Sequence, residues 1–150
     1  LIKKLKSLAI ELECPVVVAI QSNRGGEGRK LGDNIDSSVI ASSDRVQWFS
    51  DFTFFLAQKT REEVQWDGED FGTHILVPLK TRYQGRHATG HQDLVRRRDP
   101  NGNERFYKNY INFRIENFNM TEEGTLHDIA EQERMQLRAE DTNENDGELL

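Results

Sequence analysis

The sequence predicts an α/β domain with a mostly parallel sheet, because a helix-like segment is followed by short apolar runs typical of buried strands. Residues 2–12 repeat apolar side chains at helical spacing, and Pro15 ends that segment. Residues 16–20 form a β-branched run without alternation, as expected of a strand that is buried on both faces. A helix followed by a buried strand is the unit from which α/β sheets are built.

The middle of the chain continues this pattern. Residues 21–36 are rich in glycine and polar side chains and are expected to form a long loop. The spacing then predicts a helix within residues 39–51 and a second buried strand at residues 52–57. Residues 58–72 are polar, which predicts a connection between strands. Residues 73–81 are predicted to form a third strand.

A β-hairpin region follows. Residues 94–98 and 104–107 flank the sequence Asp99-Pro100-Asn101-Gly102, whose residue types favour a tight turn. Alternating apolar residues predict a further strand at 110–116, and Glu122-Glu123-Gly124 predicts a turn.

Two regions are expected: a main domain at residues 1–124 and a C-terminal segment at residues 125–150. The second comprises a short helix at residues 126–137 and an acidic tail whose composition predicts disorder. The chain also opens inside a helix-like segment without a methionine, so we expect it to be part of a longer protein.

Charge is unevenly distributed along the 150 residues, which together carry a net charge of −6. Residues 80–108 hold eight basic and three acidic residues, whereas residues 131–150 hold seven acids and two arginines. Because binding follows the local field, the basic middle is compatible with a polyanionic partner. The single cysteine, Cys14, and the lack of a signal or membrane segment indicate a cytoplasmic protein.

The order of four short motifs gives the most specific functional signal. They are residues 21–24 (QSNR), 42–51 (SSDRVQWFSD), 52–56 (FTFFL) and 79–85 (LKTRYQG). This order resembles the second half of the RecA-like motor domain of DnaB-family hexameric replicative DNA helicases, from bacteria and phages. In that family one strand ends in Gln or His, and a later strand ends in Lys-x-Arg followed closely by Gly. The resemblance covers roughly residues 1–90.

The resemblance assigns roles to three residues that follow strands. It implies that Gln21 senses a terminal phosphate at the carboxyl end of its strand. It implies that Lys80 and Arg82 reach across a subunit interface to the γ-phosphate of ATP in the neighbouring subunit. Their alternate spacing places both on the same side of the strand. The plainer interpretation is a polar strand end and a pair of surface cations.

A positive, glycine-containing loop precedes the second strand. The resemblance places it in the central channel of the ring, where it would grip the backbone of single-stranded DNA without sequence preference. Family members often carry Arg and Gly where this chain has Ala41 and Asp44, so the contacts are expected to be redistributed. The candidate DNA-binding residues are Arg24, Arg29, Lys30, Ser42, Ser43 and Arg45. The alternative is a solvated surface loop.

This chain is not expected to hydrolyse ATP alone. The glycine-rich residues 25–32 lack the Gly-Lys-Ser/Thr sequence that binds phosphate and Mg²⁺. ATP and Mg²⁺ would therefore be held mainly by the missing half or by a neighbouring subunit. His87 and His91 stand four apart, but the glycines around them argue against a helix, so we expect no metal site.

The expected partners follow from the same resemblance. They are single-stranded DNA, the protein's own N-terminal half, identical subunits in a homo-hexamer, and a primase or helicase loader that docks on the acidic tail. Two other functions stay open. One is a RecA-like recombinase, and the other is a non-catalytic DNA-binding or regulatory module that lacks its own ATP site.

Overall fold

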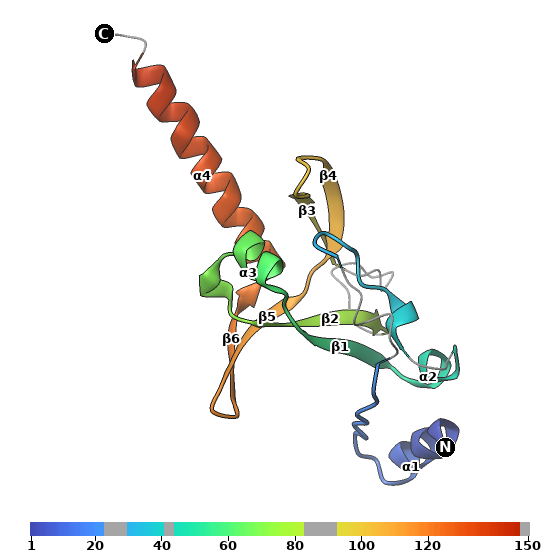
Figure 1. The fold of residues 1–150 in the computed structure, drawn as a ribbon. Helices are drawn as coiled ribbons and strands as arrows, with labels where there is room; N and C mark the ends of the chain where they lie inside the picture. The colour runs from blue at the N-terminus through green and yellow to red at the C-terminus, as the bar shows by residue number, and fades with distance from the viewer. Residues whose placement is uncertain (23–29, 41–43, 83–92, 148–150) are drawn as a thin grey trace.

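The computed structural model describes residues 1–22, 30–40, 44–82 and 93–147 (Figure 1). Most helices and 3-10 turns lie in the first half of the chain, and the second half consists of consecutive strands followed by one long helix. In order, the elements are α1 (Ile2–Glu11), η2 (Ser37–Val39), α2 (Asp44–Phe49), β1 (Phe52–Gln58), α3 (Arg61–Asp67), η3 (Glu69–Phe71), β2 (His74–Thr81), β3 (Leu94–Arg98), β4 (Glu104–Lys108), β5 (Ile111–Glu116), β6 (Asn119–Thr125) and α4 (Leu126–Gly147). The α/β class is therefore as predicted.

The direction of the strands differs from the prediction. Every strand pair among the described residues is antiparallel: a four-stranded sheet in the order β1-β2-β5-β6, and a separate hairpin of β3 and β4. The connections explain this arrangement. Tight turns join β3 to β4 and β5 to β6, and such turns can link only antiparallel neighbours. The parallel, RecA-like part of the expected sheet has no counterpart among the described strands.

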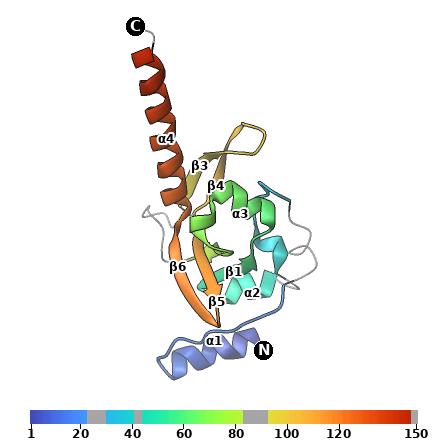
Figure 2. The ribbon, with the colours of Figure 1, turned by 60° about the vertical axis from the view of Figure 1, so that its left-hand side comes forward.

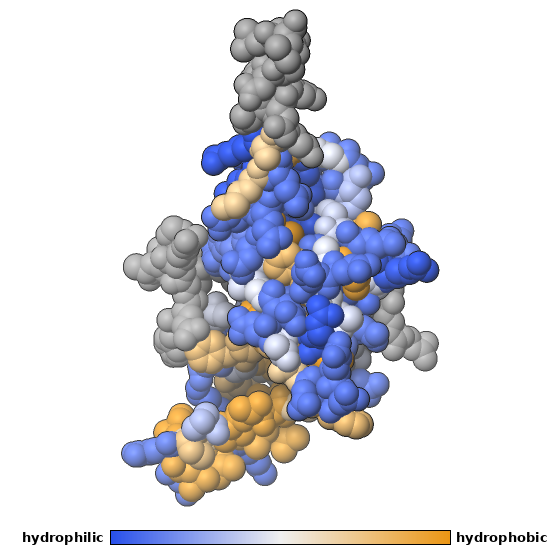
Figure 3. Space-filling model, turned by 90° about the vertical axis from the view of Figure 1, so that its left-hand side faces the viewer, coloured by the Kyte–Doolittle hydropathy of each residue, from blue (hydrophilic) through white to orange (hydrophobic). Residues whose placement is uncertain are grey.

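Residues 16–20 do not form the buried strand that their composition predicts. They have no regular secondary structure, and their side chains are exposed. A β-branched run becomes a strand only where a neighbour supplies the other half of the hydrogen-bond ladder, and no described strand lies beside it. Together with α1, which buries none of its residues, this segment presents a continuous apolar surface (Figure 3).

The strand at residues 52–57 is confirmed as β1, but it is not buried on both faces. Exposed side chains alternate with half-buried ones along it, because only one face of the sheet is covered. Phe52, Phe54 and Leu56 are on the open face. The third strand is confirmed as β2, and its pairing with β1 shifts register beside Pro78. The predicted helix at 39–51 is shorter, with η2 before α2.

The C-terminal elements are longer than predicted. The predicted turn at residues 122–124 lies inside β6, and the chain reverses instead at Asn117 and Phe118, which both have positive φ. The helix predicted for 126–137 continues to Gly147, and most of the tail expected to be disordered is helical. Figures 1 and 2 both show α4 projecting away from the rest of the molecule.

Two clusters of buried side chains form the core on one side of the sheet. One joins the β3–β4 hairpin and the start of α4 to η3. The other lies between β2 and the segment before α2, and the half-buried Tyr110 packs against both. The first cluster contains Phe71, Val95, Tyr107, Leu126, Ile129 and Ala130. The second contains Val39, Ile75, Val77 and Leu79.

Gly72 fixes the approach of η3 to the sheet, and its substitution is the first test of this fold. A Cβ atom at Gly72 would lie 2.5 Å from the carbonyl oxygen of Phe113, and the backbone φ is +67°. That oxygen also accepts a hydrogen bond from Thr73, so the strand cannot easily move away. We expect Gly72→Ala to lower the free energy of unfolding by at least about 2 kcal/mol, measured by urea denaturation.

The matched control is Gly102 in the β3–β4 turn. It also has positive φ, at +86°, but a Cβ atom there would meet nothing within 4 Å. Gly102→Ala should therefore lower the free energy of unfolding by only about 1 kcal/mol, the cost of placing an alanine at positive φ. Equal losses in the two variants would show that the contact with Phe113 does not constrain Gly72.

No described helix has both the length and the apolar composition needed to cross a lipid bilayer.

Candidate functional site

Lys80 and Arg82 come together at the end of β2. Lys80 is paired with Thr53 of β1, and the backbone N–H of Arg82 donates to the carbonyl of Asp51 (2.9 Å). Both side chains then reach the carboxyl end of α2. The Lys80 ammonium donates to the carbonyl oxygen of Gln47, and the Arg82 guanidinium donates to that of Trp48 (2.9 Å). Carbonyl groups at the carboxyl end of a helix have no partner within the helix and attract cations. This explains why Lys80 and Arg82 both donate to the end of α2.

Asp51 and Lys6 complete this group, which we call the cation cluster (Lys6, Asp51, Lys80, Arg82). The Asp51 carboxylate pairs with Lys6 of α1 through one oxygen, and with Arg82 through the other (3.3 Å). The hydrogen bond from Lys6 is the main reason that the pKa of Asp51 is below its usual value. Partial burial and then the nearby Arg82 lower the pKa of Lys80. The cluster joins α1, α2 and β2.

The cation cluster remains open to a ligand. The side chains of Lys6, Asp51 and Arg82 are 34%, 29% and 37% exposed. The cluster contains three cations and one carboxylate, which pairs with Lys6 and Arg82, so the local charge is positive. A planar guanidinium beside an ammonium can bind the oxygens of a phosphate group. The arrangement can therefore stabilise negative charge that is presented from outside this chain.

Gln21 does not occupy the predicted position at the carboxyl end of a buried strand. Its side chain is exposed, and the segment before it has no strand partner among the described residues. The prediction relied on a parallel sheet, whose strand ends meet at one edge. Ser22 instead forms an isolated antiparallel bridge with Ile40, which brings the two ends of the loop together.

The candidate DNA-binding residues are only partly within the described structure. Arg24, Arg29, Ser42 and Ser43 lie outside the described residues, as do His87 and His91. Lys30 is exposed, and its backbone N–H donates to the Asp33 carboxylate (2.8 Å). Arg45 belongs to the first turn of α2. The loop therefore leads directly into the helix whose far end contacts Lys80 and Arg82.

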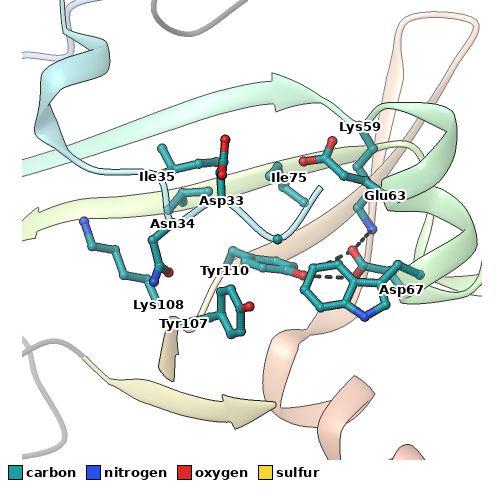
Figure 4. Close-up of a pocket in the computed structure, with 13 residues that line it drawn as sticks. Asp33, Asn34, Ile35, Lys59, Glu63, Asp67, Ile75, Tyr107, Lys108 and Tyr110 are labelled. Atoms are coloured by element: carbon teal, nitrogen blue, oxygen red, sulfur yellow. Dashed lines mark hydrogen bonds and ion pairs between the residues drawn. The ribbon is translucent and has the colours of Figure 1, made fainter. Parts of the chain in front are cut away.

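A second charged site, which the sequence interpretation missed, lies inside the protein. Asp67, at the end of α3, pairs with Lys59 (2.8 Å) and with Arg97 of β3. The side chains of Lys59 and Arg97 are 0% exposed, and that of Asp67 is 3% exposed. The hydroxyl of Tyr110 also donates to Asp67 (3.0 Å) (Figure 4). We call Lys59, Asp67 and Arg97 the buried charge network.

Arg97 links this network to the rest of the core. It pairs with Glu133 of α4 (2.8 Å), and its guanidinium lies 4.0 Å from the ring centre of Trp66. Burial opposes the charge of Arg97, but the bond to Glu133 and the carboxylate of Asp67 outweigh it and raise its pKa. Burial is the main cause that lowers the pKa of Lys59 and raises that of Tyr110. These contacts assign the network a structural role.

Two local signals in the sequence point to this network. Thr60 and Glu63 form a capping box that starts α3, a helix absent from our prediction. The three arginines at residues 96–98 alternate across β3, so the middle one faces inward while its neighbours are exposed. The run of three arginines alone is equally compatible with a phosphate contact or a solvated strand edge.

A shallow pocket borders the buried charge network (Figure 4). Residues 32–35, α3, β2 and the end of β4 line it, and its walls carry both signs of charge. The Tyr107 hydroxyl on this wall is buried and has no hydrogen-bond partner among the described residues. The described residues contain no group of three or more potential ligands that could hold a metal ion.

Known proteins offer no assignment for either site. Comparison of the chain with models of protein families, with curated proteins and with solved structures gives no match.

Proposed function

We propose that the chain is part of the RecA-like motor domain of a DnaB-family replicative helicase, an ATP-dependent enzyme that translocates on single-stranded DNA. The observation that carries the proposal is the meeting of Lys80 and Arg82 at one partly exposed point, next to the helix that follows the candidate DNA loop. The order of the four sequence motifs supports it independently.

The chemistry of the cation cluster suits phosphoryl transfer. Negative charge spreads over the oxygens of the transferred phosphoryl group in the transition state, and cations that are already in place stabilise it without reorganisation. Arg82 would be an arginine finger, a residue that reaches the γ-phosphate of ATP bound by a neighbouring subunit. Lys80 would assist it. ATP and Mg²⁺ would be held mainly by the half of the domain that carries the phosphate-binding loop.

The exposed apolar surfaces support the proposal that another half of the domain packs here. β1 is an edge strand, and its open face carries Phe52 and Phe54, which are 42% and 48% exposed. Val17, in the unpaired run at residues 16–20, is 94% exposed. Open edges and large apolar faces are usually covered in native proteins. The protein's own N-terminal half would cover them.

The remaining parts of the proposal concern assembly. Fingers that act in trans require identical subunits in a ring, which we propose to be a homo-hexamer. The candidate DNA loop would line its channel, with Arg24, Arg29, Lys30, Ser42, Ser43 and Arg45 near the DNA backbone. The projecting, acidic α4 would be the docking element for a primase or loader. The enzyme would work in the cytoplasm of a bacterium or of a phage-infected host.

The test uses the intact protein that contains these residues. We expect it to hydrolyse ATP, to do so faster with oligodeoxythymidylate, and to displace a strand from a forked DNA duplex. Binding to the oligonucleotide should weaken as salt rises, because cations on the loop replace counterions on the DNA. DNA binding without any ATP hydrolysis would favour the non-catalytic module instead, and strand exchange without unwinding would favour a recombinase.

A further inference from the structure

The β3–β4 hairpin has two faces with different surroundings. On its inner face, Val95 and Tyr107 are buried in the core cluster that includes the start of α4. Leu94, Arg96 and Phe106 alternate with these residues along the strands and lie on the outer face. Leu94 and Phe106 are 51% and 60% exposed, and the Arg96 side chain is 62% exposed. The core thus holds the hairpin from behind and leaves its outer face open.

Phe106 and Arg96 stand side by side on this outer face. They are directly opposite in the register of the hairpin, so their Cβ atoms are about 5 Å apart. The two strands together contain five basic residues and one acidic residue, Glu104, and of the basic residues Arg97 is the buried one. The outer face is therefore positively charged and carries an exposed aromatic ring. Unpaired nucleic acid offers the matching groups, since a base can stack on a ring while its phosphate meets a cation.

The described end of the candidate DNA loop lies against the same hairpin. The side-chain amide of Asn34 donates to the carbonyl oxygen of Phe106 (3.1 Å), across 72 residues of the chain. A Cβ atom added to Gly32 would lie 3.1 Å from the ring of Pro100, in the turn of the hairpin. The fold therefore joins the hairpin to residues 32–34, so that both can contact one bound strand.

We propose that the outer face of the β3–β4 hairpin binds single-stranded DNA, with a base stacked on Phe106 and a phosphate at Arg96. This inference rests on the DNA-binding part of the function proposed above and does not depend on ATP hydrolysis. Stacking needs unpaired bases, because the bases of a duplex are already stacked on one another. The hairpin should therefore favour a single strand over a duplex, without preference for sequence.

Substitutions of Phe106 in the intact protein test the stacking. We expect Phe106→Ala to weaken binding of fluorescent oligodeoxythymidylate about tenfold, measured by anisotropy, because base–aromatic stacking contributes to affinity. Phe106→Leu keeps an apolar side chain without a ring and should lose about as much, whereas Phe106→Tyr should bind like the wild type. Binding to a blunt duplex and the melting temperature should stay unchanged in all three variants, since Phe106 is largely exposed.

Arg96 and its neighbour Glu104 test the phosphate contact, with opposite expected signs. Their side chains form an exposed ion pair (3.3 Å). Arg96→Ala should weaken binding and reduce the slope of log affinity against log salt by about 0.7, the value for one single-strand phosphate. Glu104→Gln releases Arg96 and should tighten binding by about two- to fivefold. Phe106→Ala should leave the salt slope unchanged, because it removes no charge.

The turn between β5 and β6 supplies matched controls. Figures 1 and 2 both place this turn on the opposite side of the sheet from the hairpin. Phe118 in the turn is fully exposed, and Glu116 at the end of β5 is exposed as well. Phe118→Ala and Glu116→Gln make the same chemical changes as the hairpin variants and should leave oligonucleotide binding unaltered.

The outcomes separate this inference from the proposed function. Wild-type affinity in Phe106→Ala, in a protein that binds the oligonucleotide, would refute the role of the hairpin and leave DNA binding to the loop. An equal loss of duplex binding in Phe106→Ala would also overturn it, because a duplex has no free base to stack. A wild-type protein that does not bind the oligonucleotide would refute both the hairpin site and the DNA-binding part of the proposed function.

Discussion

Asp67→Ala is expected to lower the free energy of unfolding by about 3–5 kcal/mol, because it removes the buried carboxylate that two buried cations share. Lys59 and Arg97 are both completely buried, and Asp67 is their common partner. Few single substitutions have effects of this size, and most of those also leave buried charges or cavities.

The remaining contacts cannot compensate for the loss. Lys59 would keep a hydrogen bond to the carbonyl of Phe71 (3.2 Å), and Arg97 would keep its pair with Glu133. Neither contact supplies a buried negative charge, since the Glu133 side chain is 38% exposed. The Tyr110 hydroxyl would also lose its acceptor. Deprotonation of Lys59 is the easiest relief, and burial already lowers its pKa.

The measurement is the free energy of unfolding by urea, with the change followed by circular dichroism. Glu104→Ala is the control, because it removes a carboxylate from a pair with Arg96 whose side chains are 62% and 51% exposed. That loss should be about 0–1 kcal/mol. Similar small losses in both variants would mean that the buried charge network does not hold α3, β3 and α4 together.

Most elements of the fold could be predicted because their signals are local. The apolar spacing of residues 2–12 gives α1, and the turn residues Asp99 to Gly102 give the hairpin of β3 and β4. In that turn, the Asp99 carboxylate accepts hydrogen bonds from the backbone N–H groups of Asn101 and Asn103 (2.9 and 2.8 Å). Such contacts involve only neighbouring residues, so composition and spacing are sufficient.

The direction of the sheet could not be predicted because strand pairing is not local. Residues 16–20 and 52–56 both appear as buried strands in the sequence, yet the first segment has no strand partner in the described part of the chain and the second is at the edge of the sheet. The same apolar run fits a parallel core, an antiparallel edge or a surface that another chain covers. What decides among these is the neighbour, and the sequence of the strand does not contain it.

The candidate site could be predicted only where its signal is local. The alternate spacing of Lys80 and Arg82 places them on one side, and both reach the end of α2. Their anchors could not be found in this way, because Lys6 and Asp51 are 45 residues apart in the chain. The buried charge network was missed because its members are far apart in the chain: Lys59 lies between β1 and α3, Asp67 in α3 and Arg97 in β3.

Arg82→Ala in the intact protein is expected to reduce DNA-stimulated ATP hydrolysis by about 10³-fold or more, within the range of about 10³–10⁵ for a finger in phosphoryl transfer. The loss should appear in kcat, because the guanidinium acts on charge that develops in the transition state. Arg82→Lys keeps the charge but loses the fork of donors, so its rate should lie between those of the wild type and Arg82→Ala. The control is Arg98→Ala, which removes an exposed arginine of β3 and should leave the rate unchanged.

Mixing of subunits tests whether Arg82 acts across an interface. Subunits with Arg82→Ala keep their own nucleotide site, whereas subunits with an inactivated phosphate-binding loop keep their own finger. If the finger acts in trans, a mixture of the two forms sites in which an intact loop faces an intact Arg82, and ATP hydrolysis returns to a measurable fraction of the wild-type rate. If the finger acts within its own subunit, no such site can form, and the mixture stays as inactive as its components. Recovery of hydrolysis would therefore place Arg82 at a subunit interface, and its absence would remove the main reason for a ring.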